Sequence, residues 1–170
     1  MNATRARKGF LIVIAACSGT GKSTVCRALL KQDPTMRVSV SYTTRAPRGQ
    51  EENGVHYHFV SSDEFQGMVE NREFLEWAQV HDRAYGTGRA ATEAMLEQGH
   101  DVLLDIDIQG AFQIRETFGE RSILIFLLPP DWATIRQRLE SRGTEAEEQI
   151  LRRLATAREE LQRAGEMEYM

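Results

Sequence analysis

The stretch Gly9-Phe-Leu-Ile-Val-Ile-Ala-Ala16-Cys-Ser-Gly-Thr-Gly21-Lys-Ser-Thr24 places an apolar run directly before a glycine-rich loop. A short, nearly continuous apolar run is typical of a strand that is buried on both faces of a parallel sheet. The residues after the loop, Lys22 to Gln32, read as a helix that ends before Asp33-Pro34. The stretch therefore predicts a strand, a tight loop and a helix in succession, as at the start of an α/β fold.

The loop nearly matches the phosphate-binding pattern G-x-x-x-x-G-K-[ST], although Ala16 stands at the position of the first glycine. In such a loop the backbone N–H groups and the positive end of the helix converge on an anion. Glycines let the backbone wrap closely, the lysine supplies a mobile charge, and the serine offers a hydroxyl to Mg²⁺. We therefore predict a phosphate site built from Ser18, Gly19, Thr20, Gly21, Lys22, Ser23 and Thr24.

The same stretch can also be interpreted as an export signal. Arg5, Arg7 and Lys8 would form its basic region, Phe10 to Ala16 its hydrophobic core, and Cys17 a lipid-carrying processing site. A lipoprotein would follow its cysteine with a loosely structured tether, whereas Cys17 is followed at once by the complete loop. The strand and helix on either side also argue against a chance glycine-rich turn, so we favour the phosphate site.

Composition agrees with a cytoplasmic nucleotide enzyme. The 170 residues suffice for one globular unit with a sizeable core, and no apolar run is long enough to span a membrane. Cys17 and Cys26 match no metal-ligand spacing, which favours free thiols in a reducing compartment. The net charge of -4 argues against broad nucleic-acid binding. The sequence leaves the oligomeric state open.

The rest of the chain alternates between strand and helix patterns, which predicts a doubly wound α/β core with a parallel sheet flanked by helices. Further buried strands are expected at Val102–Ile106 and Ile123–Leu128, and helices at Ala91–Gln98, Gln109–Phe118, Trp132–Arg142 and, with amphipathic spacing, Glu145–Arg163. Between the first helix and the second buried strand, Val38–Tyr42 and Val55–Val60 are β-rich and separated by turn residues. We interpret this middle part as a small β-rich insertion.

A series of motifs in the insertion and after it makes the sequence specific. S-x-S-x-T-T-R-x-P-R begins at Ser39, and N-G-x-x-Y, F-L-E-W, Y-G-T and L-D-I-D-x-Q-G follow in order. Together with the glycine-rich loop, this series strongly resembles guanylate kinase. The resemblance implies transfer of the γ-phosphoryl group of ATP to GMP, giving ADP and GDP, with Mg²⁺ as cofactor. It also implies a P-loop core (1–38, 90–136 and 154–170), a GMP-binding insertion (39–89) and a helical lid (137–153).

The resemblance assigns GMP binding to positions whose chemistry fits guanine. Guanine presents two adjacent donors on its Watson–Crick edge, and a fixed carboxylate such as Glu76 accepts from both. Adenine lacks this donor pair. Two arginines three residues apart, Arg45 and Arg48, fit a clamp on the GMP phosphate, although basic turns are usually solvated. The residues carried over from the family are Ser41, Arg45, Arg48, Tyr57, Glu76, Tyr85, Thr87 and Asp107.

Asp105 and Asp107 end a predicted buried strand, and their spacing of two places them on one strand face. The carboxyl ends of parallel strands are where such folds bind ligands. We expect one aspartate, with Ser23, to organise Mg²⁺ directly or through water and the other to contact GMP. Asp105 is our choice for the metal, but the sequence does not decide between the two.

The catalytic group that the resemblance implies is Lys22, Arg45, Arg138, Arg142 and Arg153, the last three from the lid. Phosphoryl transfer spreads negative charge over several oxygens, and arginines arriving with a closing lid would neutralise it and exclude water. Gly143 and the segment 144–148 would permit that movement. Arg152 is more simply a surface residue that pairs along its helix.

Three features limit or extend the resemblance. Cys17 lies near the positive end of a helix, so we predict a reactive thiol whose alkylation blocks ATP binding. His56 and His58 share a strand face without further metal ligands in sight, and His81 and His100 read as surface residues. The family continues beyond Glu168-Tyr-Met170 into an edge strand and a helix, whose loss would weaken stability and ATP affinity.

Three other functions would each account for part of the pattern. A non-catalytic module of the same fold would not need the glycine-lysine-serine loop or the lid arginines. A kinase acting on a sugar phosphate would not need Glu76 with Ser41 and Thr87. A GTPase would carry N-K-x-D, which is not present, and would leave the Arg45 and Arg48 pair unexplained.

Overall fold

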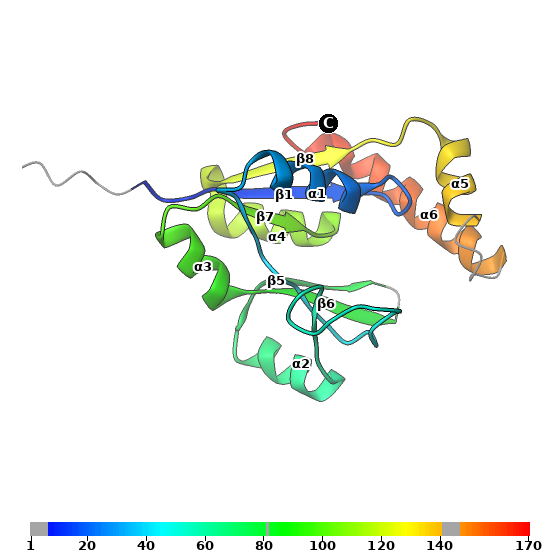
Figure 1. The fold of residues 1–170 in the computed structure, drawn as a ribbon. Coiled ribbons are helices and arrows are strands. Elements are labelled where there is room, and N and C mark those ends of the chain that lie inside the picture. The colour runs from blue at the N-terminus through cyan, green and yellow to red at the C-terminus, as the bar shows by residue number, and fades with distance from the viewer. Residues whose placement is uncertain (1–6, 81, 141–146) are drawn as a thin grey trace, which may run out of the picture.

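The computed structural model describes residues 7–80, 82–140 and 147–170, which form a helix-flanked sheet and a smaller unit beside it (Figure 1). The larger unit contains β1 (Leu11–Ala16), α1 (Lys22–Gln32), β2 (Arg37–Val38), α3 (Arg89–Glu97), β7 (Val102–Asp105), α4 (Ile108–Phe118), β8 (Ser122–Leu127), α5 (Trp132–Glu140) and α6 (Glu147–Arg163), with 3-10 turns at Gly119–Arg121 and Ala164–Glu166. The smaller unit contains β3 (Tyr42–Thr43), β4 (His58–Phe59), α2 (Ser62–Glu70), β5 (Phe74–Val80) and β6 (Arg83–Gly88).

The sheet of the larger unit is parallel and has the strand order β2-β7-β1-β8. Leu11 at the start of β1 aligns with Val102 on β7 and with Ser122 on β8, so the three strands run in step. Their carboxyl ends therefore meet at one edge of the sheet, where β1 leads into the glycine-rich loop. This arrangement confirms the predicted α/β class.

Both faces of the sheet are covered, which explains the continuous apolar run of β1. Leu11 and Val13 belong to a core cluster that includes residues of α4 and α6, among them Ile114 and Ala157. Ile14 instead packs with Cys26 of α1 in a second cluster. Alternate side chains thus bury against helices on opposite faces, as expected for a strand inside a parallel sheet.

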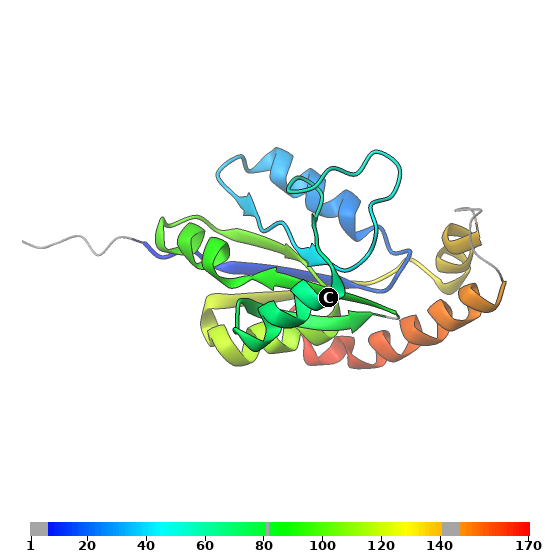
Figure 2. The same ribbon diagram turned by 90° about the horizontal axis from the view of Figure 1, so that it is seen from below.

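The smaller unit is built on a second sheet with the order β4-β3-β6-β5, in which β5 and β6 form an antiparallel hairpin. Helix α2 packs on this sheet through Phe65, which stacks on Phe74 at 4.6 Å between ring centroids. Seen from below, α2 covers the hairpin on the side away from the larger sheet (Figure 2). The unit therefore has a small core of its own, and it is the β-rich insertion predicted from the sequence.

The detail of the insertion differs from the prediction. The run Val38–Tyr42 is not one strand, because β2 pairs with β7 in the larger sheet before the chain crosses to β3 in the second sheet. Within Val55–Val60 only His58 and Phe59 form a strand. Helix α2 and the hairpin were not predicted as elements. Ser61, which accepts a hydrogen bond from the Glu64 N–H, was the available signal for the start of α2.

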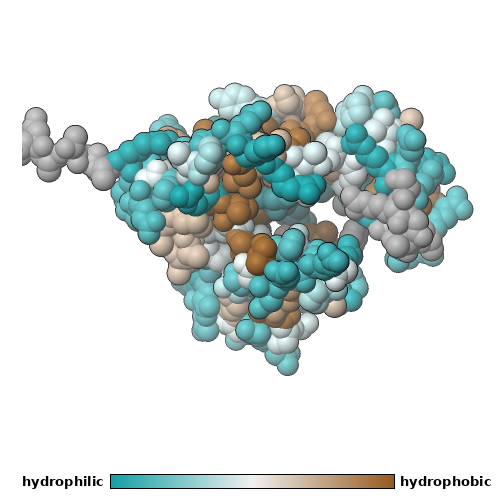
Figure 3. Space-filling view, in the orientation of Figure 1, coloured by the Kyte–Doolittle hydropathy of each residue, from teal (hydrophilic) through white to brown (hydrophobic). Residues whose placement is uncertain are grey.

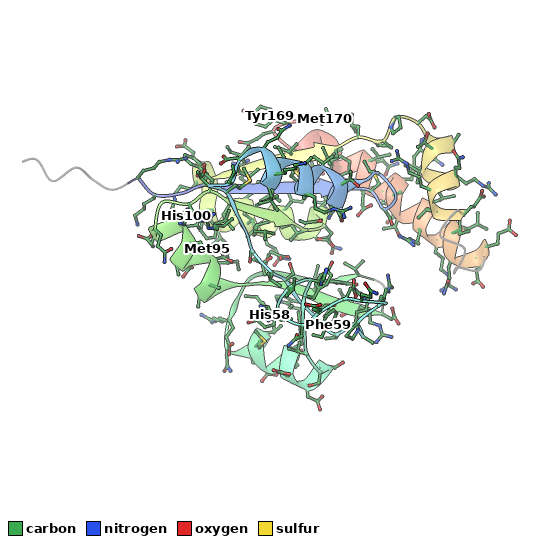
Figure 4. The ribbon with its side chains drawn as sticks, in the orientation of Figure 1. His58, Phe59, Met95, His100, Tyr169 and Met170 are labelled. Atoms are coloured by element: carbon green, nitrogen blue, oxygen red, sulfur yellow. The ribbon has the colours of Figure 1, made fainter. Side chains whose placement is uncertain are left out.

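The open edge of β8 is partly covered by the last residues of the chain. Tyr169 donates its N–H to the Leu124 carbonyl (3.2 Å) and accepts from the Phe126 N–H (2.9 Å). Figure 4 shows Tyr169 and Met170 beside β8. Among the described helices, none combines the length and apolar character required to cross a membrane.

Candidate functional site

The glycine-rich loop joins β1 to α1 and turns at two glycines. Gly19 has a φ of 88° and Gly21 a φ of 106°, values that a side chain would strain. Gly21 is the N-cap of α1, so the N–H groups of the first helical turn have no carbonyl partner within the helix and are available to an anion. Ala16 needs no such backbone: Arg72 is the only non-glycine residue with positive φ in the described chain. The methyl group at position 16 is therefore accommodated without strain.

Lys22 and Ser23 face the end of the neighbouring strand β7. The Lys22 Nζ lies 2.7 Å from Asp105 Oδ1 and donates to the Ile106 carbonyl at 2.6 Å. The Ser23 hydroxyl donates to Asp105 Oδ2 at 3.2 Å. The structure thus brings three predicted residues into direct contact at the carboxyl edge of the sheet.

Asp107 has a different setting from Asp105. Strand β7 ends at Asp105, so the argument that both aspartates share one strand face was wrong. Asp107 is the N-cap of α4, and its Oδ1 accepts from the Gly110 N–H at 2.8 Å. Both residues nevertheless line the same cavity, Asp105 from the end of β7 and Asp107 from the start of α4.

Glu76 is an almost fully buried carboxylate on β5, with 4% of its surface exposed. The hydroxyl of Thr87, its partner across the hairpin, donates to Glu76 Oε1 at 2.5 Å. Burial raises the pKa of Glu76 to about 7, and the Thr87 hydrogen bond opposes that rise. Glu76 and Ser41 both line the cavity, whereas Thr87 is fully buried behind Glu76. Thr87 therefore orients the carboxylate.

Arg45 is buried and held by a residue that the sequence analysis did not single out. Its guanidinium donates to both carboxylate oxygens of Glu51, at 2.8 and 2.9 Å, and lies 5.2 Å from the ring centre of Tyr57. Glu51 Oε2 also accepts from the Arg48 peptide N–H at 2.7 Å. These hydrogen bonds from Arg45 lower the pKa of Glu51. An acidic residue three positions after Arg48 in a basic turn was the signal that could have indicated it.

The arginines predicted to belong to a lid, where they lie within the described residues, contact the glycine-rich loop. Arg138 donates to the carbonyls of Gly19 (3.1 Å) and Thr20 (2.7 Å). Arg153 donates to the Ser18 hydroxyl. Arg142, Gly143 and most of the segment 144–148 lie outside the described residues. Arg152 pairs with Glu148 on the exposed face of α6, as expected for a surface residue.

Helix α6 contributes a further acidic residue to the site. Glu160 lines the cavity, and burial followed by the nearby Asp107 charge raises its pKa to about 7. It lies on the same helix face as Arg153 and Ala157, at the spacing i, i+4 and i+7. From the sequence this helix is predicted only to be amphipathic, and the available signal for Glu160 is a carboxylate on the face that carries Arg153.

The predicted reactivity of Cys17 is contradicted by its surroundings. The residue is 2% exposed, and its Sγ donates to the Ala157 carbonyl at 3.2 Å. Burial raises the pKa of Cys17 to about 12, so the thiol stays protonated and inert at neutral pH. The loss of solvation thus affects the pKa of Cys17 more than the nearby start of α1 does. Cys26 is also buried.

The histidines form no metal site in the described residues, where no three His, Cys, Asp or Glu side chains gather around one point. His58 lies in the insertion and stacks on Tyr42 at 4.5 Å between ring centroids. His100 lies at the far end of the larger unit (Figure 4). His81 is outside the described residues.

One cavity of about 480 Å³ connects these groups. It lies between the two units, where the surface is hollowed (Figure 3). Predicted residues that line it are Ser18, Gly19, Gly21, Lys22, Ser23, Thr24, Ser41, Tyr57, Glu76, Tyr85, Asp105 and Asp107. The predicted residues that do not line it are Thr20, Arg45, Arg48, Thr87, Arg138 and Arg153.

Comparisons with known proteins agree on one family. The family model described as guanylate kinase matches residues 8–170. Guanylate kinase of Caldanaerobacter subterraneus subsp. tengcongensis is 45% identical over 96% of this chain and 79% of its own length. Guanylate kinase of Neisseria meningitidis serogroup B is 48% identical over 93% and 77%. The crystal structure of guanylate kinase from Anaplasma phagocytophilum covers 96% of this chain and 76% of its own, with a TM-score of 0.80 at 33% identity.

Proposed function

The chain belongs to the guanylate kinase family and transfers the γ-phosphoryl group of ATP to GMP, giving ADP and GDP, and from this premise we propose that one cavity holds both substrates. The glycine-rich loop forms one wall of that cavity and the β5–β6 hairpin another. This shared lining is the observation that carries the proposal, because direct transfer requires the two nucleotides to meet without intervening water.

ATP binds through residues 18–24. The N–H groups at the start of α1 take the phosphates, and the Nζ of Lys22 moves from Asp105 to their oxygens. The Thr20 hydroxyl supports this role, because its oxygen is buried and has no hydrogen-bond partner among the described residues. A bound phosphate would provide the missing acceptor.

GMP binds against the insertion. The Glu76 carboxylate, oriented by Thr87, accepts from the two adjacent donors of guanine, and Ser41 and Asp107 line the cavity beside it. Tyr57 and Tyr85 line the part of the wall that leads to Arg45. Arg45 and Arg48 clamp the GMP phosphate, and Glu51 holds the Arg45 guanidinium and the Arg48 peptide N–H.

Mg²⁺ fits the residues at the edge of the sheet. Ser23 and Asp105 offer only oxygen ligands there, and they already contact each other at 3.2 Å. Mg²⁺ typically takes one or two protein oxygens together with phosphate oxygens and water. We assign the ion to Ser23 and Asp105, directly or through water, because the Asp107 carboxylate is engaged as a helix cap. When bound, the ion draws charge from the transferring phosphoryl group.

The remaining catalytic residues act on the charge of the transition state. Lys22 and Arg45 reach it from the loop and the insertion, and Arg138, Arg142 and Arg153 reach it from the lid, which we place at 137–153. The hydrogen bonds of Arg138 and Arg153 to the glycine-rich loop support this role for two of them. We place the core at 1–38, 90–136 and 154–170 and the GMP-binding unit at 39–89. ATP and GMP as substrates, together with two free thiols, support a cytoplasmic location.

A coupled assay of ADP release tests these assignments. The chain is given ATP and Mg²⁺ with GMP or AMP, and Lys22→Met and Glu76→Gln are measured beside it. We expect turnover with GMP only, a loss of turnover of 100-fold or more in Lys22→Met, and a raised KM for GMP in Glu76→Gln. Equal KM values for GMP in Glu76→Gln and the parent chain would refute the assignment of the base-reading carboxylate.

A further inference from the structure

Strand β5 is an edge strand whose outer side is occupied by one side chain of the core. It pairs with β6 on one side only. On the other side Gln113 of α4 accepts from the Trp77 N–H (3.2 Å at Oε1) and donates to the Trp77 carbonyl (2.8 Å from Nε2). A single amide thus takes both backbone groups of Trp77, as the backbone of a neighbouring strand would.

The same face of α4 also contacts the residue before Trp77. Gly110, one turn before Gln113, has no side chain, and a Cβ there would lie 2.3 Å from Glu76 Oε2. The Glu76 carboxylate therefore rests directly on the backbone of α4. Asp107, the N-cap of α4, lines the same cavity as Glu76. One helix thus fixes the position of two carboxylates, one of which belongs to the other structural unit.

We propose that Gln113 is a positioning residue for GMP: by holding Trp77 it keeps the Glu76 carboxylate in register with Asp107 at the start of α4. The proposal rests on the assignment of Glu76 to guanine binding. Gln113 is half-buried and does not line the cavity, so it acts on the substrate only through β5.

Two other features of the contact suit this role. Figure 1 shows α4 on the side of the larger sheet that faces the insertion, with β5 beneath it. Leu75, the residue before Glu76, is buried in the main core cluster together with Ile108 and Ala111 of α4. Leu75 supplies nondirectional packing, whereas the Gln113 amide fixes the strand along its own axis, because both hydrogen bonds would lengthen if β5 slid.

Steady-state kinetics of Gln113→Ala and Gln113→Glu test the proposal on the full chain. Gln113→Ala removes both hydrogen bonds, and Gln113→Glu keeps the length and the acceptor but sets a carboxylate oxygen against the Trp77 carbonyl. We expect the KM for GMP to rise about tenfold in both variants, equivalent to about 1.4 kcal/mol. We expect the KM for ATP to stay within twofold. Gln66→Ala is the matched control, because Gln66 is an exposed helical glutamine whose side chain bonds Glu70 on its own helix.

The pattern across substrates separates positioning from simple stabilisation. A lowered melting temperature with an unchanged KM for GMP would overturn the proposal, as would an equal rise of both KM values. Glu76→Gln in the same assay distinguishes a failure of the underlying assignment: if its KM for GMP is normal, Glu76 does not read GMP. If Glu76→Gln is impaired while Gln113→Ala and Gln113→Glu are normal, only the role of Gln113 is refuted.

Discussion

Adding one methyl group to α4 should impair GMP binding while the helix itself becomes more favourable. In Gly110→Ala the new Cβ lies 2.3 Å from Glu76 Oε2 and 2.9 Å from its Cδ. Ordinary van der Waals contact begins at 3.4 Å, so the carboxylate must retreat by about 1.1 Å, the difference between 3.4 and 2.3 Å. A displacement of this size breaks the alignment of at least one hydrogen bond to guanine.

The magnitude follows from the charged hydrogen bond that is lost. Such a bond contributes roughly 1.5–3 kcal/mol, so the dissociation constant for GMP should rise about 10- to 150-fold. Alanine is favoured over glycine in a helix by up to about 1 kcal/mol, and part of this preference applies in the first turn, where Gly110 lies, and offsets some of the strain. Gly110→Ala should therefore melt within a few degrees of the parent chain although it binds GMP poorly.

Calorimetric titration with GMP and with ATP, together with thermal unfolding, checks this prediction. Gly67→Ala is the matched control: Gly67 lies inside α2, and a Cβ there would meet nothing within 4 Å. The control should gain stability and bind GMP normally. A dissociation constant for GMP within twofold of the parent value in folded Gly110→Ala would refute the reasoning, because Glu76 would then tolerate the displacement.

Four further predictions concern charged and reactive groups. Because burial raises the pKa of Glu76 to about 7, its ionised fraction and hence the affinity for GMP should rise about tenfold between pH 6 and pH 8, relative to Glu76→Gln titrated alongside. Protonated Glu76 also favours the folded state, because its pKa is about 7 in the folded chain against 4.5 in the unfolded one. The free energy of unfolding should therefore fall as the pH rises from about 4.5 to about 7, measurable by denaturant unfolding. Cys17, whose pKa is raised to about 12, should resist iodoacetamide at pH 8 until the chain unfolds, and rapid labelling counted by mass spectrometry would contradict its burial. Glu51→Gln should raise the KM for GMP several-fold by loosening Arg45, and a lowered KM would mean that Glu51 instead blocks the phosphate site.

The sequence predicts the fold of the larger unit because its signals are local. The run Leu11–Ala16 is apolar at every position, and the helix Lys22–Gln32 has the predicted bounds because Asp33-Pro34 ends it. The insertion was harder to predict. The run Val38–Tyr42 looks continuous in sequence, yet its two ends pair in different sheets, and such pairing depends on distant partners.

The residues of the candidate site likewise divide into those with a local sequence signal and those whose role depends on distant partners. Lys22, Ser23 and Asp105 could be named from motifs, and the structure brings them into contact. Glu51 and Gln113 belong to no motif, because their importance lies in what they hold: the Arg45 guanidinium and the Trp77 backbone. The Cys17 prediction was wrong for a related reason, since proximity to a helix end is readable in sequence but burial beneath α6 is not.

From the charge of the cavity we expect cationic side chains to move toward the phosphates before the reaction. Its wall carries four carboxylates, Glu76, Asp105, Asp107 and Glu160, and two cations, Lys22 and Arg27. Like charges and burial together account for the raised pKa of Glu160. ATP and GMP add further negative charge, so this arrangement disfavours their phosphates until guanidinium groups enter. The carboxylates suit the donor edge of guanine, whereas we expect the phosphates to need more positive charge than Lys22 and Arg27 supply. We therefore expect the groups that read the base to be in place in this conformation and charge neutralisation to be completed on closure, which would tie catalysis to the presence of both nucleotides.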